Sequence, residues 1–381
     1  MCILLVIASY ILLIASNHGI MMQLGDEFMR IFDLKKEADV LLNNNIVNLL
    51  TAIHEYKGKQ EFYIDSNTDI LSSLLMFSRI DSISSSNRIE GISTSNKRIT
   101  EIVRNGSMPI NRSEEEIAGY KDVLNMIVDN YKYIDITSGI ILQLHRDLYK
   151  YSNASYGGKY KDSQNYIEEA LEDGTKRIRF TPLTALETPI AIDKLCKSYI
   201  DAINDGYDPL LLIPIFIFDF VSIHPFNDGN GRMSRLLTLL LLYKSNYFVG
   251  KYISIEKLIE ETKEVYYDAL GNSSIGWHDN KNDYSSFVEY YLGIILAAYK
   301  EFAFRVEYTF NKKMTAIERV SSIFMVSVIP ISKSYIMEKC PDISETTIER
   351  SLKTLLDDKC IEKISGGRYS MYKWVKTFEN D

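Results

Sequence analysis

Residues 224–235 of this 381-residue chain read His-Pro-Phe-Asn-Asp-Gly-Asn-Gly-Arg-Met-Ser-Arg. The stretch combines a side chain that can accept a proton, a carboxylate that can bind a metal ion, a glycine-rich turn and two arginines. Groups of these types can neutralise and orient phosphates while a neighbouring base activates a nucleophile. The spacing therefore indicates a site that holds a nucleoside triphosphate and directs an attack on it.

The glycine-rich turn, residues 229–231, leads directly into a predicted helix. The N–H groups at such a helix start are free to bind an anion, and the helix dipole adds partial positive charge. Arg232 and Arg235 are neighbours in the first turn, so both can reach phosphate oxygens with their planar donor groups. The candidate nucleotide-binding residues of this segment are Gly229, Asn230, Gly231, Arg232, Met233, Ser234 and Arg235.

Two further side chains flank this turn. A carboxylate next to phosphates would repel them unless a cation lay between, so Asp228 is the candidate ligand of a Mg²⁺ ion. His224 follows an apolar segment, and an imidazole with an ordinary pKa of about 6.5 is mostly neutral at pH 7, which suits a general base. Each feature alone is more often a plain turn or a structural side chain, and only the combination is specific.

The same residues match every fixed position of HPFx(D/E)GNGRxxR, the signature of the Fic family, and the chain resembles that family. Its members are mainly protein adenylyltransferases. The resemblance implies that His224 deprotonates a Ser, Thr or Tyr hydroxyl of a target protein. This hydroxyl would attack the α-phosphate of ATP, so that AMP is transferred and diphosphate leaves.

The resemblance also implies a role for each part of the turn. Asp228 would hold Mg²⁺ between the α- and β-phosphates, residues 229–231 would supply the anion hole, and Arg232 would bind the β/γ end. The family's kinase-like branch has Ala-Asn-Lys in place of Gly-Asn-Gly. This sequence keeps the glycines, so it favours adenylyl transfer over phosphorylation.

A second resemblance concerns residues 86–91, Ser-Asn-Arg-Ile-Glu-Gly, which are similar to the family's inhibitory motif (S/T)xxxE(G/N). It implies that Glu90, with Ser86 and Gly91 beside it, pairs with Arg235. A carboxylate and a γ-phosphate would then compete for one guanidinium, so we expect self-inhibition. The plain alternative is a solvated glutamate on a helix. In some relatives the same glutamate supports removal of AMP.

Hydrophobic periodicity predicts a mainly α-helical fold, with a Fic-type helical bundle core and one β-hairpin. Residues 209–223 are apolar on nearly every face and should form a buried central helix. Residues 165–182 contain Asp-Gly between two extended runs, which is a hairpin signal. They resemble the family's flap, an edge that docks the target by strand addition. Its candidate docking residues are Ile178, Arg179 and Phe180.

Local patterns give several more expectations. The serines of residues 82–91 should cap a short helix that Gly91 ends. Residues 93–112 are polar and should form a connector, and residues 254–270 should form one helix. Tyr266 and Tyr267 resemble a tyrosine pair that lines the adenine pocket in relatives, with core packing as the alternative.

After about residue 313 the pattern of three short helices and a terminal hairpin predicts a winged helix-turn-helix domain. Its candidate recognition helix, residues 344–358, is rich in acidic side chains, whereas groove-reading helices are normally basic. We therefore favour a protein-interaction role, or support of a homodimer, over DNA binding. The alternative function is a winged-helix transcription regulator whose core only senses nucleotide.

Composition sets the remaining expectations. The net charge of −8 argues against broad binding to nucleic-acid backbones. The four cysteines show neither disulfide nor metal-site spacing, so a cytoplasmic location is predicted. Residues 3–14 are apolar but too short to span a membrane and lack a preceding basic residue, so no membrane association is expected. We divide the chain into a leader or spurious extension (1–20), an N-terminal helical region (21–110), a catalytic core (111–312) and the winged-helix domain (313–381).

Overall fold

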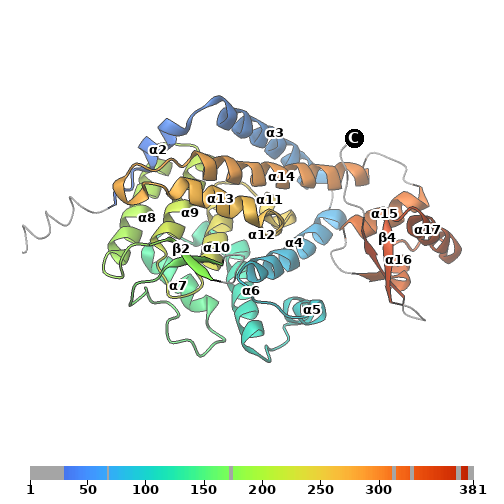
Figure 1. The fold of residues 1–381 in the computed structure, drawn as a ribbon. Coiled ribbons are helices and arrows are strands. Elements are labelled where there is room, and N and C mark those ends of the chain that lie inside the picture. Colours follow the sequence, from blue (N-terminus) through green and yellow to red (C-terminus); the bar gives the residue numbers. More distant parts are fainter. Residues whose placement is uncertain are drawn as a thin grey trace, which may run out of the picture.

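The structure, a computed structural model, describes residues 30–66, 68–170, 175–310, 315–326, 330–365 and 370–375. The described part of the chain is mainly helical, as predicted, and Figure 1 shows the order of its elements. The proposed leader and the predicted turn residues of both hairpins lie outside the described residues.

The helices of the N-terminal region and the core are α2 (Leu34–Leu41), α3 (Asn44–Ser66), α4 (Thr68–Ile89), α5 (Asn96–Asn105), α6 (Arg112–Asn130), α7 (Ser138–Leu148), α8 (Thr188–Asn204), α9 (Pro209–Ile223), α10 (Asn230–Lys244), α11 (Val249–Tyr252), α12 (Ile255–Glu261), α13 (Lys263–Ser274) and α14 (Ser285–Phe310). Two 3₁₀ turns, η1 (Tyr131–Tyr133) and η2 (Trp277–Asp279), connect parts of this set. Among the described residues, no helix has the length and apolar character needed to cross a membrane.

Helix α9 lies at the centre of the core. It is apolar on all faces and packs against α2, α8, α10 and α14, so it is covered on every side, as the sequence predicts for such a helix. Its one buried carboxylate, Asp219, accepts hydrogen bonds from Trp277 Nε1 (2.7 Å) and the Tyr284 hydroxyl. Arg30 lies 3.6 Å from the same carboxylate, which compensates its burial.

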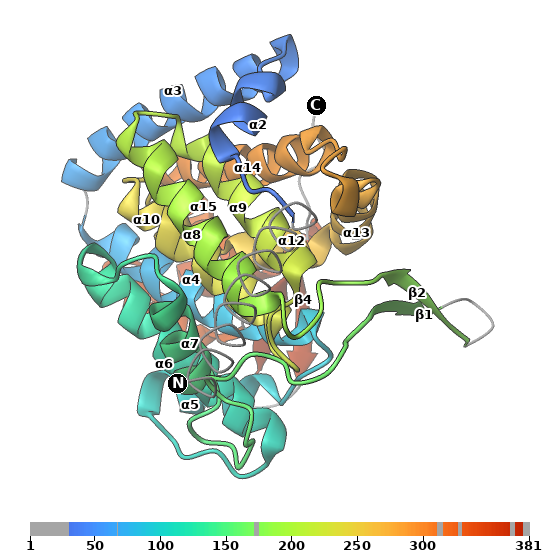
Figure 2. The ribbon, with the colours of Figure 1, turned by 90° about the vertical axis from the view of Figure 1, so that its left-hand side faces the viewer.

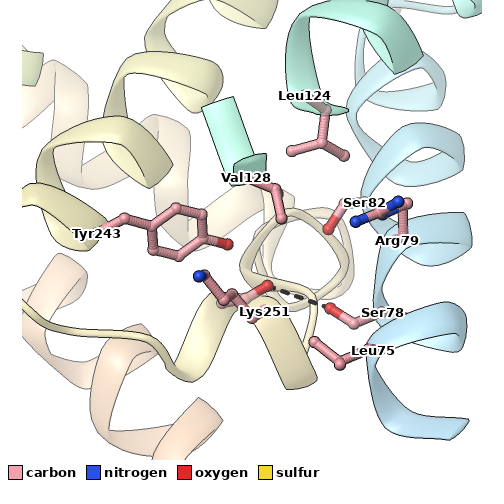
Figure 3. Close-up of a pocket in the computed structure, with 9 residues that line it drawn as sticks. Leu75, Ser78, Arg79, Ser82, Leu124, Val128, Tyr243 and Lys251 are labelled. Atoms are coloured by element: carbon pink, nitrogen blue, oxygen red, sulfur yellow. Dashed lines mark hydrogen bonds between the residues drawn. The ribbon is translucent and has the colours of Figure 1, made fainter. Parts of the chain in front are cut away.

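Helix α4 crosses one side of the core and contacts α6, α11 and α12. The Ser78 hydroxyl donates to the carbonyl of Gly250, beside a small pocket of about 20 Å³ that α4 shares with α6, α10 and α11 (Figure 3). One turn further along, Ser82 donates to the buried carboxylate of Glu256 (2.8 Å). These contacts fix the helix that ends next to Glu90.

Three local expectations are wrong. Residues 82–89 do not form a separate short helix, because they are the last turns of α4 and their serines are buried within it, although the helix does end just before Gly91, whose φ is 76°. The polar segment 93–112 contains α5, which Ser95 caps through its side chain and Gly106 ends with a φ of 65°. The single helix predicted over 254–270 is interrupted at Thr262, where α12 ends and α13 begins.

The predicted flap hairpin is present. Strands β1 (Ile167–Ala170) and β2 (Lys176–Phe180) pair antiparallel, with Glu168 opposite Ile178. Figure 2 shows the hairpin extending from the helical core. The sheet described here has only these two strands, so no third strand borders β2 within the described part of the chain.

The C-terminal unit, residues 316–375, has its own small hydrophobic core. It contains α15 (Ala316–Val326), β3 (Ile331–Ser332), α16 (Lys333–Lys339), α17 (Glu345–Asp357), β4 (Ile361–Ser365) and β5 (Met371–Trp374). The strands form an antiparallel sheet in the order β3-β5-β4. Figure 1 shows this unit near the end of α14, and α15 contacts both α14 and α4.

Candidate active site

The motif forms the junction between α9 and α10. Helix α9 ends at His224, whose backbone is left-handed (φ 51°, ψ 62°), and Gly229 turns the chain into α10 with a φ of 83°. The Asn230 side chain closes the loop: Oδ1 accepts from the N–H of Phe226 (2.9 Å), and Nδ2 donates to its carbonyl (2.8 Å). A left-handed histidine is strained, so its place at this junction depends on surrounding contacts.

The His224 ring is oriented by its own helix. Nδ1 lies 3.2 Å from the carbonyl of Val221, and because a carbonyl can only accept, Nδ1 carries the proton of the neutral ring. Nε2 is then left with a lone pair. Burial lowers the pKa of His224 to about 4, so the ring is neutral at physiological pH and able to accept a proton.

A cavity of about 310 Å³ adjoins this ring. It brings together residues from α9, α10, α13, the hairpin and the end of α4. The lining residues are Glu90, Tyr166, Ile167, Glu168, Arg179, Phe180, Phe218, Val221, Ser222, His224, Gly231, Arg235, Tyr266, Tyr267, Leu270, Gly271 and Ser274.

Arg235 and Glu90 are in direct contact at the edge of this cavity. Arg235 is 4% exposed, and its Nη2 lies 2.7 Å from Glu90 Oε1. Ser86 also binds the guanidinium. Its hydroxyl accepts from Nε, and its carbonyl accepts from Nη2 (2.8 Å each). The predicted pairing of Glu90 with Arg235 is therefore seen in the structure.

Glu90 also lies against the glycine-rich turn. A Cβ atom placed on Gly231 would be 2.1 Å from Glu90 Oε1 and 3.2 Å from Arg235 Nη1. Only glycine allows the carboxylate to approach this closely. The carboxylate thus occupies the space over the helix start, where an anion would bind.

The Arg232 side chain points away from the cavity and into the protein interior. Its side chain is buried, with Nη1 2.7 Å from Glu116 Oε2 and Nη2 donating to the Tyr149 hydroxyl (2.6 Å). It does not line the cavity. A contact between Arg232 and a phosphate, as the family resemblance implies, would require the side chain to leave Glu116.

Asp228 is half-exposed at the motif turn. Its Oδ1 accepts from the N–H of Gly229 (2.7 Å), and its Oδ2 lies 3.4 Å from the Tyr156 hydroxyl and 3.8 Å from Arg232. Within the described ranges, no cluster of three or more His, Cys, Asp or Glu side chains forms a metal cage. One accessible carboxylate beside the glycine-rich helix start is compatible with Mg²⁺, which usually binds together with substrate phosphates and keeps several waters.

The remaining predicted residues divide into two groups. Tyr266 and Tyr267 both line the cavity, in edge-to-face contact at 5.3 Å, although Tyr266 is nearly buried. Met233 and Ser234 lie in the interior, where the Ser234 hydroxyl donates to the carbonyl of Gly231. They contribute to the packing of α10 and not to the cavity wall.

Two flap residues are attached to α13 and to the turn η2. Arg179 Nη2 donates to the carbonyl of Tyr267 (2.5 Å), and the absence of a side chain at Gly271 makes room for it. The Phe180 ring stacks on His278 with centroids 5.4 Å apart. Ile178 faces outward and is 53% exposed, so it is the one predicted docking residue left open to a target.

Sequence patterns missed a histidine beneath the motif. His145 is fully buried and stacks on Phe226 with centroids 3.7 Å apart. Its Nδ1 accepts from the N–H of Gly158, so Nε2 donates to the carbonyl of Asp228 (3.0 Å). The ring therefore supports the backbone of the motif turn at Asp228. A lone histidine within the amphipathic helix α7 gives no local sign of this contact.

The chain is similar in sequence to known proteins. Residues 135–242 match the family model described as Fic/DOC family. The chain is 27% identical over 186 residues to protein adenylyltransferase fic-1 of Caenorhabditis elegans, covering 47% of this chain and 32% of that protein. It is 30% identical over 118 residues to protein adenylyltransferase Fic of Drosophila willistoni, covering 30% and 21% respectively. The matched region thus spans a minor part of these relatives.

Solved structures show the same fold. A Fic family protein from Desulfovibrio desulfuricans G20 is similar over 89% of this chain and 98% of its own, with 22% identity and a TM-score of 0.57. Fic-1 from C. elegans is similar over 69% of this chain and 73% of its own, with 20% identity and a TM-score of 0.52. The motif lies inside the matched segment, so we conclude that residues 135–242 match the Fic/DOC family model and that the described chain has the fold of these solved structures.

Proposed function

We propose that this chain is a protein adenylyltransferase that transfers AMP from ATP to a Ser, Thr or Tyr hydroxyl of a target protein and of itself. The observation that supports it most is the cavity of about 310 Å³, which joins a neutral histidine, a glycine-rich helix start, a buried arginine and two tyrosines. A drug-sized ligand occupies a pocket of about this size. The curated relatives carry the same activity in their names.

In the proposed reaction, the acceptor hydroxyl lies beside Nε2 of His224. As its oxygen attacks the α-phosphorus, the hydroxyl proton passes to Nε2, the bond to the β-phosphate oxygen breaks, and diphosphate leaves. Nδ1–H stays on the Val221 carbonyl, which keeps the ring oriented during the transfer. The backbone N–H groups of Asn230 and Gly231 and the Arg235 guanidinium stabilise phosphate charge.

Asp228 would be the protein ligand of a divalent cation that binds together with ATP. When bound, Mg²⁺ would neutralise phosphate charge and favour departure of diphosphate. The Asp228 carbonyl is fixed by His145 and its Oδ1 by the next N–H. The carboxylate therefore stands on a fixed backbone and is half-exposed, with Oδ2 next to the Tyr156 hydroxyl.

We further propose that the protein inhibits itself through Glu90. The carboxylate uses Arg235 Nη2 and fills the space over Gly231. A γ-phosphate at the same guanidinium would meet this negative charge, so ATP would bind with its α-phosphate out of line with His224. Removal of Glu90 should allow the productive arrangement. The reverse reaction, removal of AMP, is a second activity that this glutamate could support.

The test is transfer of label from α-³²P-ATP to protein, with Mg²⁺ present. The Glu90→Gly protein should label itself, and the double variant with His224→Ala should not. Mass spectrometry should find an added AMP on a hydroxyl side chain. Label from γ-³²P-ATP without label from α-³²P-ATP would contradict adenylyl transfer, as would equal labelling with and without His224. DNA binding that ATP modulates, without any transfer, would favour the regulator alternative.

A further inference from the structure

A second group of contacts surrounds the His224 turn from the chain just before the flap. Lys161 is 3% exposed. Its Nζ donates to the carbonyl of Ile223 (3.0 Å) and to Asn165 Oδ1 (2.9 Å), and its backbone N–H donates to the carbonyl of Pro225 (2.8 Å). A buried ammonium needs such acceptors, and here they belong to the end of α9 and the motif loop.

Asn165 completes the set. Its Nδ2 donates to the carbonyls of both His224 (3.1 Å) and Phe226 (3.0 Å), while its Oδ1 is held by Lys161. Four consecutive carbonyls, residues 223–226, therefore each receive a hydrogen bond from one of these two residues. We call Lys161 and Asn165 the carbonyl bracket.

The carbonyl bracket stabilises a backbone turn that is otherwise unfavourable. A helix end leaves carbonyls without intrahelical partners, and His224 adds a left-handed backbone that is unfavourable for a residue with a Cβ. The ring itself makes only the Nδ1 contact to Val221 within the helix. The direction of Nε2 therefore depends on how firmly the backbone of residues 223–226 is held.

The bracket also joins two functional elements. Asn165 precedes strand β1 of the flap by one residue, Tyr166, which lines the cavity. Because Asn165 binds the carbonyls of His224 and Phe226, a movement of the chain at the start of the flap would also displace these carbonyls. Among the residues that the structure describes, no other contact connects the start of the flap as directly to the backbone of residues 223–226, which carries the proposed base.

We propose that Lys161 and Asn165 are positioning residues that fix Nε2 of His224 for proton transfer and couple the root of the flap to it. This inference rests on the proposed adenylyl transfer. It predicts that damage to the bracket lowers kcat and leaves the KM for ATP nearly unchanged, because neither side chain lines the nucleotide cavity. A misplacement of about 1 Å can cost roughly 100-fold in rate, so we expect a 10- to 100-fold loss.

The variants are made in the Glu90→Gly protein. Asn165→Asp keeps the shape of the side chain but removes both donated bonds, and Lys161→Met removes the ammonium while keeping its length. Lys161→Arg, which restores charged donors, should recover kcat to within roughly fivefold. Gln164→Glu is the matched control, because this exposed amide donates to the carbonyls of Asn165 and Pro182 and not to the motif. It should change kcat by less than about threefold.

A second readout does not need activity. The His224 ring signals, assigned by their loss in His224→Ala, should shift or broaden in Asn165→Asp and stay unchanged in Gln164→Glu. Thermal melting establishes that each variant is folded. If the Glu90→Gly parent shows no transfer, the proposed function fails and the ring spectrum alone decides on the bracket. Unchanged ring signals in folded Asn165→Asp, unchanged kcat, or an equal rise in KM for ATP would each overturn the inference.

Discussion

Replacing Glu90 by glycine is the most direct perturbation of the proposed inhibition. The variant removes a carboxylate that is 2.7 Å from Arg235 Nη2 and in contact with the glycine-rich turn at Gly231. Glycine adds no new group in its place. We expect the rate of self-adenylylation to rise, because the guanidinium and the helix start become available to the terminal phosphate together.

The size of the increase follows from the charges. A phosphate on Arg235 would lie about 4 Å from the Glu90 carboxylate, where two unit charges repel by about 4 kcal/mol at an effective dielectric constant of roughly 20. The Glu90 side chain is 32% exposed, so screening by solvent reduces this repulsion to between about 2 and 4 kcal/mol. At about 1.36 kcal/mol per tenfold change, the rate should rise by roughly 30- to 1000-fold.

The assay compares initial rates of α-³²P-AMP incorporation at saturating ATP and Mg²⁺. Glu90→Gln, which keeps the size but not the charge, should give an intermediate rate. The control is Glu260→Gln, which breaks the ion pair between Arg88 and Glu260 (2.7 Å) at the end of the same helix. Partly exposed pairs contribute about 0–1 kcal/mol, so this change should raise the rate by no more than a few-fold.

Two results would refute this reasoning. Equal labelling of wild type and Glu90→Gly would show that the carboxylate does not compete with phosphate. A rise of the same size in Glu260→Gln would show that loosening α4, and not removal of a charge from Arg235, raises the rate of labelling.

Two further predictions concern the surroundings of the site. Burial lowers the pKa of His145 to about 4, whereas the ordinary value of about 6.5 applies in the unfolded chain. Between these two pH values only the unfolded chain binds the proton. The free energy of unfolding should therefore decrease as the pH falls from about 6.5 to about 4, by at most about 3 kcal/mol. Urea titrations at several pH values should show this slope in wild type and a smaller slope in His145→Gln; identical slopes would contradict it. A Cβ on Gly271 would lie 2.6 Å from Arg179 Nη2, so Gly271→Ala should displace Arg179 from the Tyr267 carbonyl and loosen the flap. Trypsin should cleave the hairpin roughly tenfold faster, since a hydrogen bond to a charged group contributes about 1.5 kcal/mol or more; Arg179→Ala should abolish any further effect of the alanine, and additive effects would argue against this contact.

Local chemistry made much of the site predictable from sequence. The helix start at residues 229–231, the apolar helix α9 and the flap hairpin each follow from residues close together in the chain. The polarity of residues 93–112 predicts a connector where the structure has helix α5. Ser95 and Gly106 lie at the two ends of this helix, and these cap residues are the signals that indicate it. A count of polar residues does not detect caps, whereas their spacing does.

Long-range partners do not follow from the local pattern, and the pairing of Glu90 with Arg235 was expected only from the resemblance of residues 86–91 to an inhibitory motif. The i, i+3 spacing of Arg232 and Arg235 places both at the start of α10, but the partner of each is remote in sequence. Glu116 draws Arg232 into the interior, while α4 brings Glu90 to Arg235. Which arginine faces the cavity is therefore decided by tertiary contacts that the motif does not contain.

The contacts of Arg235 also explain why loss of Glu90 should activate the protein and not merely disorder it. Ser86 accepts from Nε through its hydroxyl and from Nη2 through its carbonyl, and both oxygens belong to the interior of α4. These bonds remain when the carboxylate is removed, so the guanidinium keeps its plane. Nη1, which points toward Gly231, then faces the space that Glu90 has left. An oriented cation beside a helix start needs little reorganisation to bind phosphate, so in the proposed mechanism the serine that supports inhibition would also orient the arginine for ATP.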